Sequence, residues 1–305
     1  MEMSVVIINP ASASGNTGEV WPQIASDLRS HFGSFRVLFT QHRGDAAALA
    51  GDAARKGAKL IIACGGDGTI SEVANGILSS GKDVELGILP SGTGGDFRRT
   101  LEIPTRSRDA ARILRTGRSV RIDVGRVSYV DHNGHDATRY FVGVASCGMS
   151  TRVIERVKTD KVSFANAVLK TAMQNAPVRL AVQLDDAHDR HLTVSNLCIA
   201  NARYFGGGMK IAPDAKLTDG KFDVIGVGDL SALKIFTSAP RVYLGSHLSM
   251  PEVSHALARK VNVRPADHDQ EVALEVDGEL PGRLPATFQI IPEALRVRVG
   301  RRLHG

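Results

Sequence analysis

The feature that most restricts the fold of this chain is a glycine-rich turn at residues 64–72, with the sequence CGGDGTISE. An apolar run at 60–63 leads into the turn, and apolar residues then recur with helical spacing from Ile70 to Leu78. This pattern predicts a strand, a tight turn and a helix N-terminus, where glycines and free N–H groups let a backbone bind phosphate. Asp67 would repel phosphate unless a cation lies between them, so the turn indicates Mg²⁺ and a nucleotide.

A second glycine turn follows after one predicted helix, at residues 87–97, with the sequence GILPSGTGGDF. In a right-handed β-α-β unit the ends of both parallel strands lie at the same edge of the sheet. We therefore expect the two turns, with Asp67 and Asp96, to lie side by side. Any single tight strand-to-helix connection also favours glycine for structural reasons alone, and the presence of two such turns strengthens the functional interpretation.

The composition is that of a globular protein. The chain has 305 residues, 43% hydrophobic and 23% charged, which is enough for two domains. We find no apolar stretch of the roughly 20 residues that span a bilayer and no signal-peptide pattern at the N-terminus. Cys64, Cys147 and Cys198 show neither disulfide nor metal-ligand spacing. The sequence therefore predicts a cytoplasmic protein.

Two histidine pairs have helical spacing, His132 with His135 and His188 with His191. Both pairs lie in polar, aspartate-containing stretches that are typical of hairpin turns. Because no third and fourth ligands accompany them, we expect solvated loops and not metal sites.

The chain is basic, with a net charge of +6 and a pI near 9.4, which favours anionic partners. Arginines are concentrated at residues 98–121, and on a predicted helix at 107–116 Arg108, Arg112 and Arg115 face outward. Nucleic acid is not expected as a partner, because only 5% of the residues are aromatic and no nucleic-acid-binding motif occurs. A nucleotide, transient contact with the anionic inner membrane surface, or an ordinary solvated arginine face would each account for the charge.

The order of predicted elements changes near residue 120. Before it, strands are expected at 5–8, 35–40, 59–64 and 85–89, and helices at 20–31 (capped by Asn16 or Thr17), 45–56, 70–79 and 107–116. After it, strands are expected at 120–127, 140–145, 178–184, 191–200, 222–227, 260–264, 271–276, 287–291 and 295–299, with helices at 164–172 and from Ser231. The first pattern predicts a doubly wound α/β domain over 1–122, and the second a mainly antiparallel β-sandwich over 123–291. Residues 292–305 are expected to pack back on the first domain, and the active site is expected in the cleft between the domains.

A set of short motifs occurs in one order along the chain. They are Asn9-Pro10, Thr40 with Gly44-Asp45-Ala46, the first glycine turn with Glu72 and Asn75-Gly76, Gly92-Thr93 with Asp96-Phe97, residues 212–220 (APDAKLTDG), and Val276-Asp277-Gly278-Glu279. With these motifs the chain resembles the diacylglycerol kinase catalytic family, which includes bacterial lipid kinases and the sphingosine kinases, over almost its whole length. It departs from the family at Gly95 and Gly143, where Asn is common, and Gly95 removes an amide close to the nucleotide.

The resemblance implies an ATP-dependent kinase with Mg²⁺ as cofactor. The residues that it implies around ATP are Asn9, Thr40, Gly65, Gly66, Asp67, Gly68, Thr69, Glu72, Thr93 and Asp96. Asp67 and Asp96 would hold the catalytic Mg²⁺, directly or through water. The resemblance also implies a structural Mg²⁺ on Asp219 and the carbonyls of Lys216 and Lys221, where an ordinary Asp-Gly turn is the alternative.

The catalytic base is expected to be Glu279, with Asp277 beside it and Asp67 holding the metal. If the strand at 271–276 continues, alternation places Glu275, Asp277 and Glu279 on one face, and crowded carboxylates raise one another's pKa. The alternative is a hairpin turn of the Asp-Gly type, which the residues alone favour and the resemblance does not.

The acceptor implied by the resemblance is a lipid alcohol, first of all diacylglycerol, which would give phosphatidic acid. Phe164, Val168 and Met173 would form an apolar wall for it, or would pack as ordinary core, and residues 206–208 (GGG) would form a turn near the cleft. An NAD kinase-like small-molecule kinase and a catalytically silent lipid- or nucleotide-binding regulator are the alternatives, and a homodimer is a further expectation.

Overall fold

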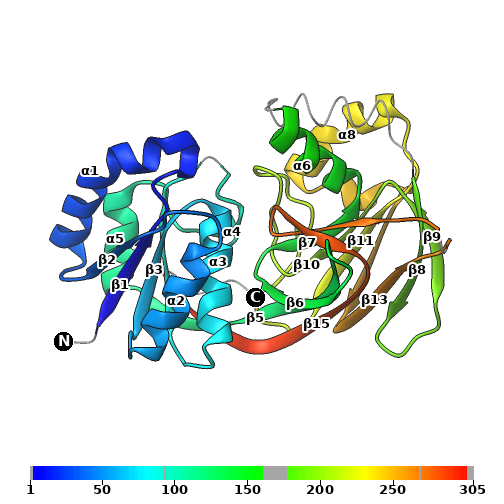
Figure 1. The fold of residues 1–305 in the computed structure, drawn as a ribbon. Helices are drawn as coiled ribbons and strands as arrows, with labels where there is room; N and C mark the ends of the chain where they lie inside the picture. The colour runs from blue at the N-terminus through cyan, green and yellow to red at the C-terminus, as the bar shows by residue number, and fades with distance from the viewer. Residues whose placement is uncertain (1–2, 93, 161–176, 268, 301–305) are drawn as a thin grey trace.

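The structure is a computed structural model that describes residues 3–92, 94–160, 177–267 and 269–300. Two halves lie side by side, and long strands along one side of the molecule join them (Figure 1). None of the described helices is long and apolar enough to cross a membrane.

The first half is a parallel sheet with helices on both faces, so the predicted α/β class is confirmed. Its strands are β1 (Ser4–Ile8), β2 (Arg36–Phe39), β3 (Leu60–Gly65) and β4 (Glu85–Pro90), in the order β2-β1-β3-β4. The helices are α1 (Asn16–His31), α2 (Asp45–Arg55), α3 (Asp67–Ser79), the short α4 (Asp96–Thr100) and α5 (Ser107–Thr116), with a 3₁₀ turn η1 at Ser12–Gly15. α1 packs against α5 on one face of the sheet and α2 against α3 on the other (Figure 1).

The first turns of two helices differ from the prediction. α1 has the left-handed Gly15 (φ 93°) as its N-cap and no side-chain cap, so capping by Asn16 or Thr17 is wrong. The buried Thr17 hydroxyl lies 2.8 Å from the carbonyl oxygen of Ser91 and ties α1 to the second glycine turn. α3 already begins at Asp67, because the polar turn residues adopt helical backbone without contributing to the apolar period.

The second half is a sandwich of mainly antiparallel strands, as predicted. Its elements are β5 (Arg118–Asp131), β6 (Asp136–Phe141), β7 (Val144–Gly148), α6 (Met149–Asp160), β8 (Val178–Leu184), β9 (Arg190–Val194), β10 (Asn196–Ala200), β11 (Phe222–Val227), α8 (Ala232–Leu244), η2 (His247–Ser249), β12 (Val253–Ala258), β13 (Lys260–Pro265), β14 (Ala273–Val276) and β15 (Glu279–Val299). One layer has the order β12-β11-β10-β7-β14-β15, and the other has the order β9-β8-β13-β15-β5-β6. Phe141 stacks on Phe222 and meets Phe288 edge to face between the layers.

β15 connects the parts of the molecule. Its first residues pair with β14 and its middle with β13 and β5, and Arg296 and Val297 then pair in parallel with β4 of the first half. An ion pair between Arg298 and Glu85 lies at the same contact. Residues 295–299 therefore belong to the first half's sheet by hydrogen bonding, whereas the predicted division at residue 122 falls inside β5 and stays a prediction.

Two predicted strands are interrupted, and two others are joined. The run at 140–145 is two strands, because the N–H groups of Val142 and Gly143 bind Asp277 instead of a strand. The run at 191–200 breaks at Ser195, whereas the strands predicted at 287–291 and 295–299 are parts of one irregular strand, β15. The helix predicted at 164–172 lies outside the described residues.

Candidate functional site

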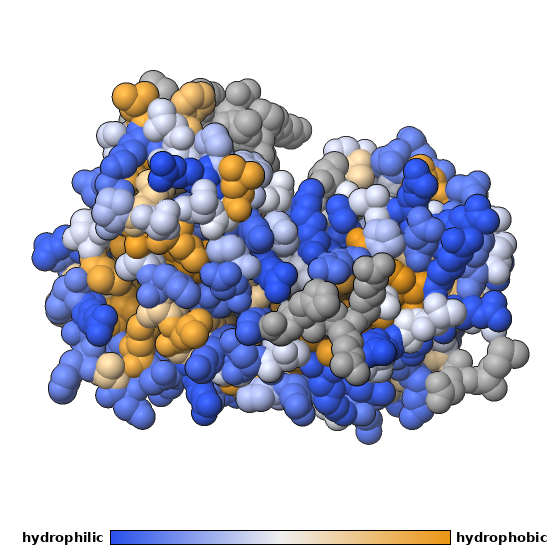
Figure 2. Space-filling model, turned by 180° about the vertical axis from the view of Figure 1, so that it is seen from behind, coloured by the Kyte–Doolittle hydropathy of each residue, from blue (hydrophilic) through white to orange (hydrophobic). Residues whose placement is uncertain are grey.

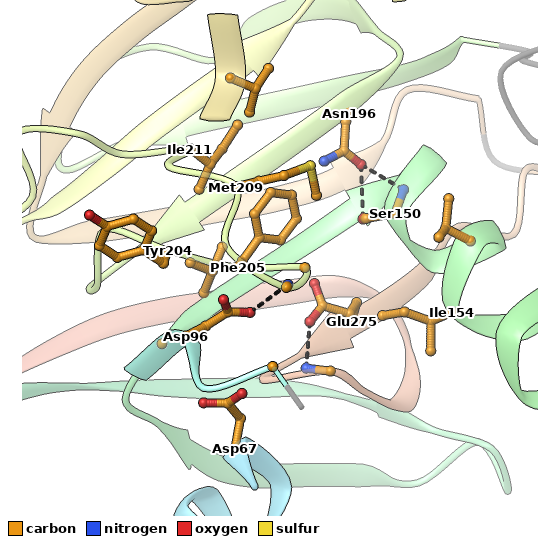
Figure 3. Close-up of a pocket in the computed structure, with 18 of the residues that line it drawn as sticks. Asp67, Asp96, Ser150, Ile154, Asn196, Tyr204, Phe205, Met209, Ile211 and Glu275 are labelled. Atoms are coloured by element: carbon orange, nitrogen blue, oxygen red, sulfur yellow. Dashed lines mark hydrogen bonds between the residues drawn. The ribbon is translucent and has the colours of Figure 1, made fainter. Parts of the chain in front are cut away.

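A cavity of about 790 Å³ lies where the two glycine turns face the second half. Gly66, Asp67 and Gly68 of the first turn and Asp96 of the second line one end of it (Figure 3). The rest of the lining is mainly apolar, and a large part of it comes from α6, α8 and the segment after β10. One cavity therefore joins a candidate phosphate site to an apolar space, in the size range of ligand pockets.

The two glycine turns lie side by side, as predicted. A Cβ on Gly92 would lie 2.6 Å from the Cα of Gly66, and a Cβ on Gly94 would lie 2.8 Å from Asp67 Oδ2. Side chains at these positions would push the turns apart, so the glycines are needed for the close approach. Thr93, between them, lies outside the described residues.

Asp67 and Asp96 begin α3 and α4. Asp67 Oδ1 accepts a hydrogen bond from the Phe97 N–H at 3.0 Å, and Asp96 Oδ2 accepts one from the Gly207 N–H at 2.8 Å. Burial, and then the charge of Asp67, raise the pKa of Asp96. Arg99 forms an ion pair with Asp96 at 3.3 Å and offsets part of the repulsion between the two carboxylates, and a cation between them would relieve the remainder.

The donor set fits Mg²⁺ held jointly with a nucleotide. Within the part of the chain that the structure describes, we find no group of three His, Cys, Asp or Glu side chains arranged to hold a metal. Asp67 and Asp96 alone would leave coordination positions for phosphate oxygens and water, which Mg²⁺ typically retains.

The other residues implied around ATP lie at the same edge of the sheet but do not line the cavity. Asn9 Oδ1 accepts from Ala11 N at 3.0 Å, and Thr40 is buried. Gly65 leaves room for Thr69, whose Oγ1 would lie 2.4 Å from a Cβ at position 65. These four residues shape the turn and the neighbouring strand ends.

Glu72 contacts the loop after β2. Its two carboxylate oxygens accept hydrogen bonds from the N–H groups of Gly44 and Ala46, each at 3.1 Å. Glu72 therefore holds the start of α2, and its side chain does not line the cavity, so its place around ATP stays a prediction. Glu72 fits the role of positioning the loop after β2.

The hairpin at residues 275–279 corrects one prediction. β14 ends at Val276, and Asp277 (φ 48°) and Gly278 (φ 82°) form a two-residue turn, so the three carboxylates do not share a strand face. The pKa of Asp277 is raised, but the main cause is burial and not carboxylate crowding.

The three carboxylates have separate partners. Asp277 accepts hydrogen bonds from Ser71 Oγ at 2.9 Å, Val142 N at 3.1 Å and Gly143 N at 2.9 Å. Glu279 forms an ion pair with Arg43 from the loop after β2. A Cβ on Gly143 would lie 2.7 Å from Asp277 Oδ1, which explains physically why this chain has glycine there.

The region predicted for a structural metal lies away from the cavity. Asp219 is exposed, and its Oδ1 accepts from Lys221 N at 3.1 Å in a local turn. Beside it, the buried Asp123 accepts from Gly220 N at 2.7 Å and from Glu293 N at 2.9 Å. The metal on Asp219 and the Lys216 and Lys221 carbonyls stays a prediction.

Part of the site could not be found from the sequence. The apolar wall predicted at Phe164, Val168 and Met173 lies outside the described residues. The described wall includes Met149, Val153, Ile154, Phe205, Met209, Ile211 and Val242. Of the glycines at 206–208, Gly206 and Gly207 line the cavity, and Gly207 N donates to Asp96. Ser150, Asn196 and Glu275 add polar groups, and the only signal for them was the acidic stretch that contains Glu275.

Comparisons with known proteins agree with this architecture. The profile of the diacylglycerol kinase catalytic domain matches residues 3–127, and that of the YegS C-terminal NAD kinase beta sandwich-like domain matches residues 143–299. The diacylglycerol kinase of Staphylococcus carnosus is 30% identical over 96% of this chain and 93% of its own length. That of Mycobacterium tuberculosis is 30% identical over 83% and 81%. A crystal structure of a diacylglycerol kinase from Bacillus anthracis superimposes with a TM-score of 0.73 at 21% identity, over 99% of this chain and 98% of that one.

Proposed function

The chain belongs to the diacylglycerol kinase family, and we propose that it transfers the γ-phosphoryl group of ATP to the hydroxyl of a lipid alcohol. The observation that carries the proposal is the shared cavity, in which Asp67 and Asp96 lie at one end and an apolar wall forms most of the rest. Phosphoryl transfer needs charge compensation at the phosphates, and a lipid acceptor needs an apolar space that reaches them. Diacylglycerol is the first acceptor to test, because it is the substrate in the names of the relatives.

In this proposal each carboxylate has its own task. The glycine turns bind the phosphates through backbone N–H groups, and Asp67 and Asp96 would hold Mg²⁺, which neutralises charge on the transferred group when bound. Glu279, half-buried at the cavity and paired with Arg43, would take the proton of the acceptor hydroxyl. Asp277 would position the hairpin that carries Glu279.

The apolar wall favours a lipid over a small polar acceptor. An NAD kinase-like enzyme would need polar contacts for a second nucleotide, whereas the wall consists largely of Met, Val, Ile and Phe side chains. A silent regulator would not need both aspartates at the phosphate end. The lipid kinase therefore accounts for more of the cavity than either alternative.

We also propose that the protein contacts membranes through α8. The inner face of α8 lines the cavity with Ile235 and Val242, whereas Leu233 (73% exposed), Phe236 (65%) and Leu244 (77%) point outward. Figure 2 shows hydrophobic residues gathered on the half that carries α8, while the first half is mostly hydrophilic. A lipid leaving a bilayer at α8 would reach the cavity directly.

The arginine face of α5 supplies a second, electrostatic contact in this proposal. Arg108, Arg112 and Arg115 are exposed, as the sequence predicted, while Ala110 and Leu114 are buried. Each basic residue near an anionic leaflet contributes about 1 kcal/mol, screened by salt. Cytoplasmic location and a homodimer stay predictions.

The test is a transfer assay with an unbiased acceptor. Purified protein is incubated with Mg²⁺, ATP and a bacterial lipid extract, and new phosphorylated lipids are identified by mass spectrometry. We expect a phosphorylated lipid that is absent with Asp67→Asn and without Mg²⁺. If ATP is consumed without any lipid product, or not consumed at all, the lipid kinase proposal is wrong.

A further inference from the structure

We propose that Arg43, an exposed residue of the first half, is a positioning residue that keeps the proposed base Glu279 ionised and in place at the phosphate end of the cavity. Arg43 lies in the loop after β2, and Glu279 is the first residue of β15. The inference rests on the proposed lipid kinase function and adds a residue that would set how its site responds to pH.

Negative charge is crowded around the cavity. Five carboxylates line it, those of Asp67, Asp96, Glu275, Asp277 and Glu279. Among the lining residues that the structure describes, none is a lysine or an arginine. The pKa of Asp96 shows the effect, since burial and then the charge of Asp67 raise it. A base in such a group would keep a proton of its own unless a cation lies beside it.

Arg99 and Arg43 bring positive charge to two of these carboxylates from outside the lining. Arg99 pairs with Asp96 at 3.3 Å, and Arg43 forms an ion pair with Glu279. A guanidinium stays charged over the whole pH range in which a carboxylate titrates, and an adjacent opposite charge favours the ionised carboxylate. Without Arg43, Glu279 would therefore bind a proton at a higher pH.

The loop after β2 is built to hold Arg43 in place. Glu72 and Asp45, two carboxylates of the first half, accept hydrogen bonds from backbone N–H groups on both sides of Arg43. These groups belong to Gly44 and Ala46, each 3.1 Å from Glu72, and to Gln41 and His42, at 2.7 and 2.9 Å from Asp45. The backbone is thus fixed to the first half, and the Arg43 side chain, although 64% exposed, reaches Glu279 of the second.

Two other basic groups lie near the hairpin at 275–279. Arg139 on β6 acts on Asp277, where its charge opposes burial, the main cause of the raised pKa of Asp277. His132, from the turn after β5, has its Nε2 2.8 Å from the carbonyl oxygen of Leu280. A neutral imidazole can donate this bond, so the contact does not require a charged ring. Both groups act on neighbours of Glu279, whereas Arg43 pairs with the proposed base itself.

The proposed transfer shows what Arg43 would change. The acceptor oxygen bonds to the γ-phosphorus of ATP, the bond from that phosphorus to the bridging oxygen of ADP breaks, and the hydroxyl proton passes to Glu279. Only ionised Glu279 can take this proton. Loss of Arg43 should therefore reduce the fraction of enzyme with a competent base at acid pH, and should leave alkaline activity and ATP binding nearly unchanged.

The test compares the pH profiles of wild type, Arg43→Gln and Arg43→Lys. The full chain is assayed with MgATP and mixed micelles of a bacterial lipid extract, between about pH 5 and pH 9, and apparent kcat and KM for ATP are measured at each pH. In Arg43→Gln we expect the acid limb of kcat about one pH unit higher, which is about a tenfold loss on the limb. Its KM for ATP and its kcat at about pH 9 should stay within about twofold of wild type. Arg43→Lys keeps the positive charge and should restore the wild-type limb.

Two control variants assign the limb to this ion pair. Arg36→Gln removes an exposed arginine at the other end of β2 and should keep the wild-type profile. His132→Gln removes the titratable ring beside the hairpin and should keep the limb as well. If His132→Gln moves the limb as Arg43→Gln does, the limb does not report Glu279 and the proposal is wrong.

The remaining outcomes also decide the matter. An unchanged acid limb in Arg43→Gln, an equal fall of kcat at every pH, or a limb in Arg43→Lys like that of Arg43→Gln would overturn the electrostatic role. A higher KM for ATP with an unchanged limb would show that Arg43 binds phosphate instead. If wild type forms no phosphorylated lipid at any pH, the proposed function itself fails, and the role of Arg43 fails with it.

Discussion

Replacing Asp277 by Asn should destabilise the protein before it affects the chemistry. The Asp277 carboxylate binds Ser71 of α3 in the first half and the N–H groups of Val142 and Gly143 in the second. It therefore clamps the hairpin at 275–279 to both halves. If this is its role, Asp277→Asn should lower the free energy of unfolding by about 2–3 kcal/mol, since a backbone donor is left unpaired.

The magnitude follows from the three bonds. Asn has one acceptor oxygen, so in either orientation of the amide one N–H group, that of Val142 or of Gly143, loses its partner, at about 1–3 kcal/mol. The other contacts change from charge-assisted to neutral bonds and weaken by about 1 kcal/mol each. Burial raises the pKa of Asp277, so the neutral amide recovers part of this loss by avoiding a desolvated charge.

The assay compares Asp277→Asn with Glu279→Gln in urea unfolding, without nucleotide and with a chelator. Glu279 pairs with Arg43, whose side chain is 64% exposed, so removing this ion pair should cost no more than about 1 kcal/mol. We expect the opposite order for catalysis. At a temperature where both variants are folded, Glu279→Gln should have far the lower kcat while ATP affinity is kept.

One result would refute the role of Asp277 as a clamp. If Asp277→Asn unfolds at the wild-type urea concentration and loses kcat as completely as Glu279→Gln, Asp277 acts in the chemistry and is not a clamp. Ser71→Ala supplies a graded check, because it removes one of the three donors and should cost less than the loss of the carboxylate.

Four further outcomes are expected. Asp67→Asn should nearly abolish phosphoryl transfer. The fold should stay intact, because the amide oxygen of Asn can still accept the hydrogen bond from Phe97 N. A variant that kept most of the wild-type kcat would refute the metal-binding role of Asp67. Burial, and then the charge of Asp67, raise the pKa of Asp96, so on the acid side the Mg²⁺-dependent kcat/KM should begin to fall at a higher pH than it would with an ordinary aspartate. Protonated Asp96 favours the folded state, and this contribution to the free energy of unfolding is lost as the pH rises through the folded-state pKa. Urea titrations of Asp96→Asn would test this pH dependence. Asp219→Ala should abolish nucleotide-free stabilisation by Mg²⁺ in thermal melts, and unchanged stabilisation would remove the structural metal. Cosedimentation should show weak, salt-reversible binding to anionic vesicles and little binding to neutral ones. Phe236→Ser should reduce the vesicle binding that remains at high salt. Equal binding to anionic and neutral vesicles would refute the electrostatic contribution.

The phosphate end of the site could be predicted from the sequence because its signals are local. Gly66, Asp67, Gly68 and Asp96 line the cavity where two strand-to-helix turns meet, as the spacing of the turns indicated. A parallel sheet places consecutive strand ends together, so short motifs there translate directly into spatial neighbours.

The acceptor end depends on pairings between distant segments, and the sequence carries little trace of them. Ser146 meets Glu275 because β7 pairs with β14, and no local pattern specifies that register. Glu72 and Asp277 lie in motifs, but their oxygens are used on backbone N–H groups of Gly44, Val142 and others. A motif can identify that a carboxylate matters without showing whether it binds a ligand or the protein itself.

β15 explains how the two ends of the site are kept in register. Its first residue, Glu279, lies at the cavity, and Arg296 and Val297 pair with β4, the strand that leads to the second glycine turn. The proposed base and the phosphate site are thus joined by one strand. Its pairing with β5 is interrupted between Ile291 and Leu295, where Glu293 N donates to the buried Asp123. A second interruption of this pairing, between Arg283 and Thr287, lies within the second half. We therefore expect relative movement of the two halves to bend β15 between Ile291 and Leu295, so the position of Glu279 over the phosphates depends on how Asp123 holds that bend.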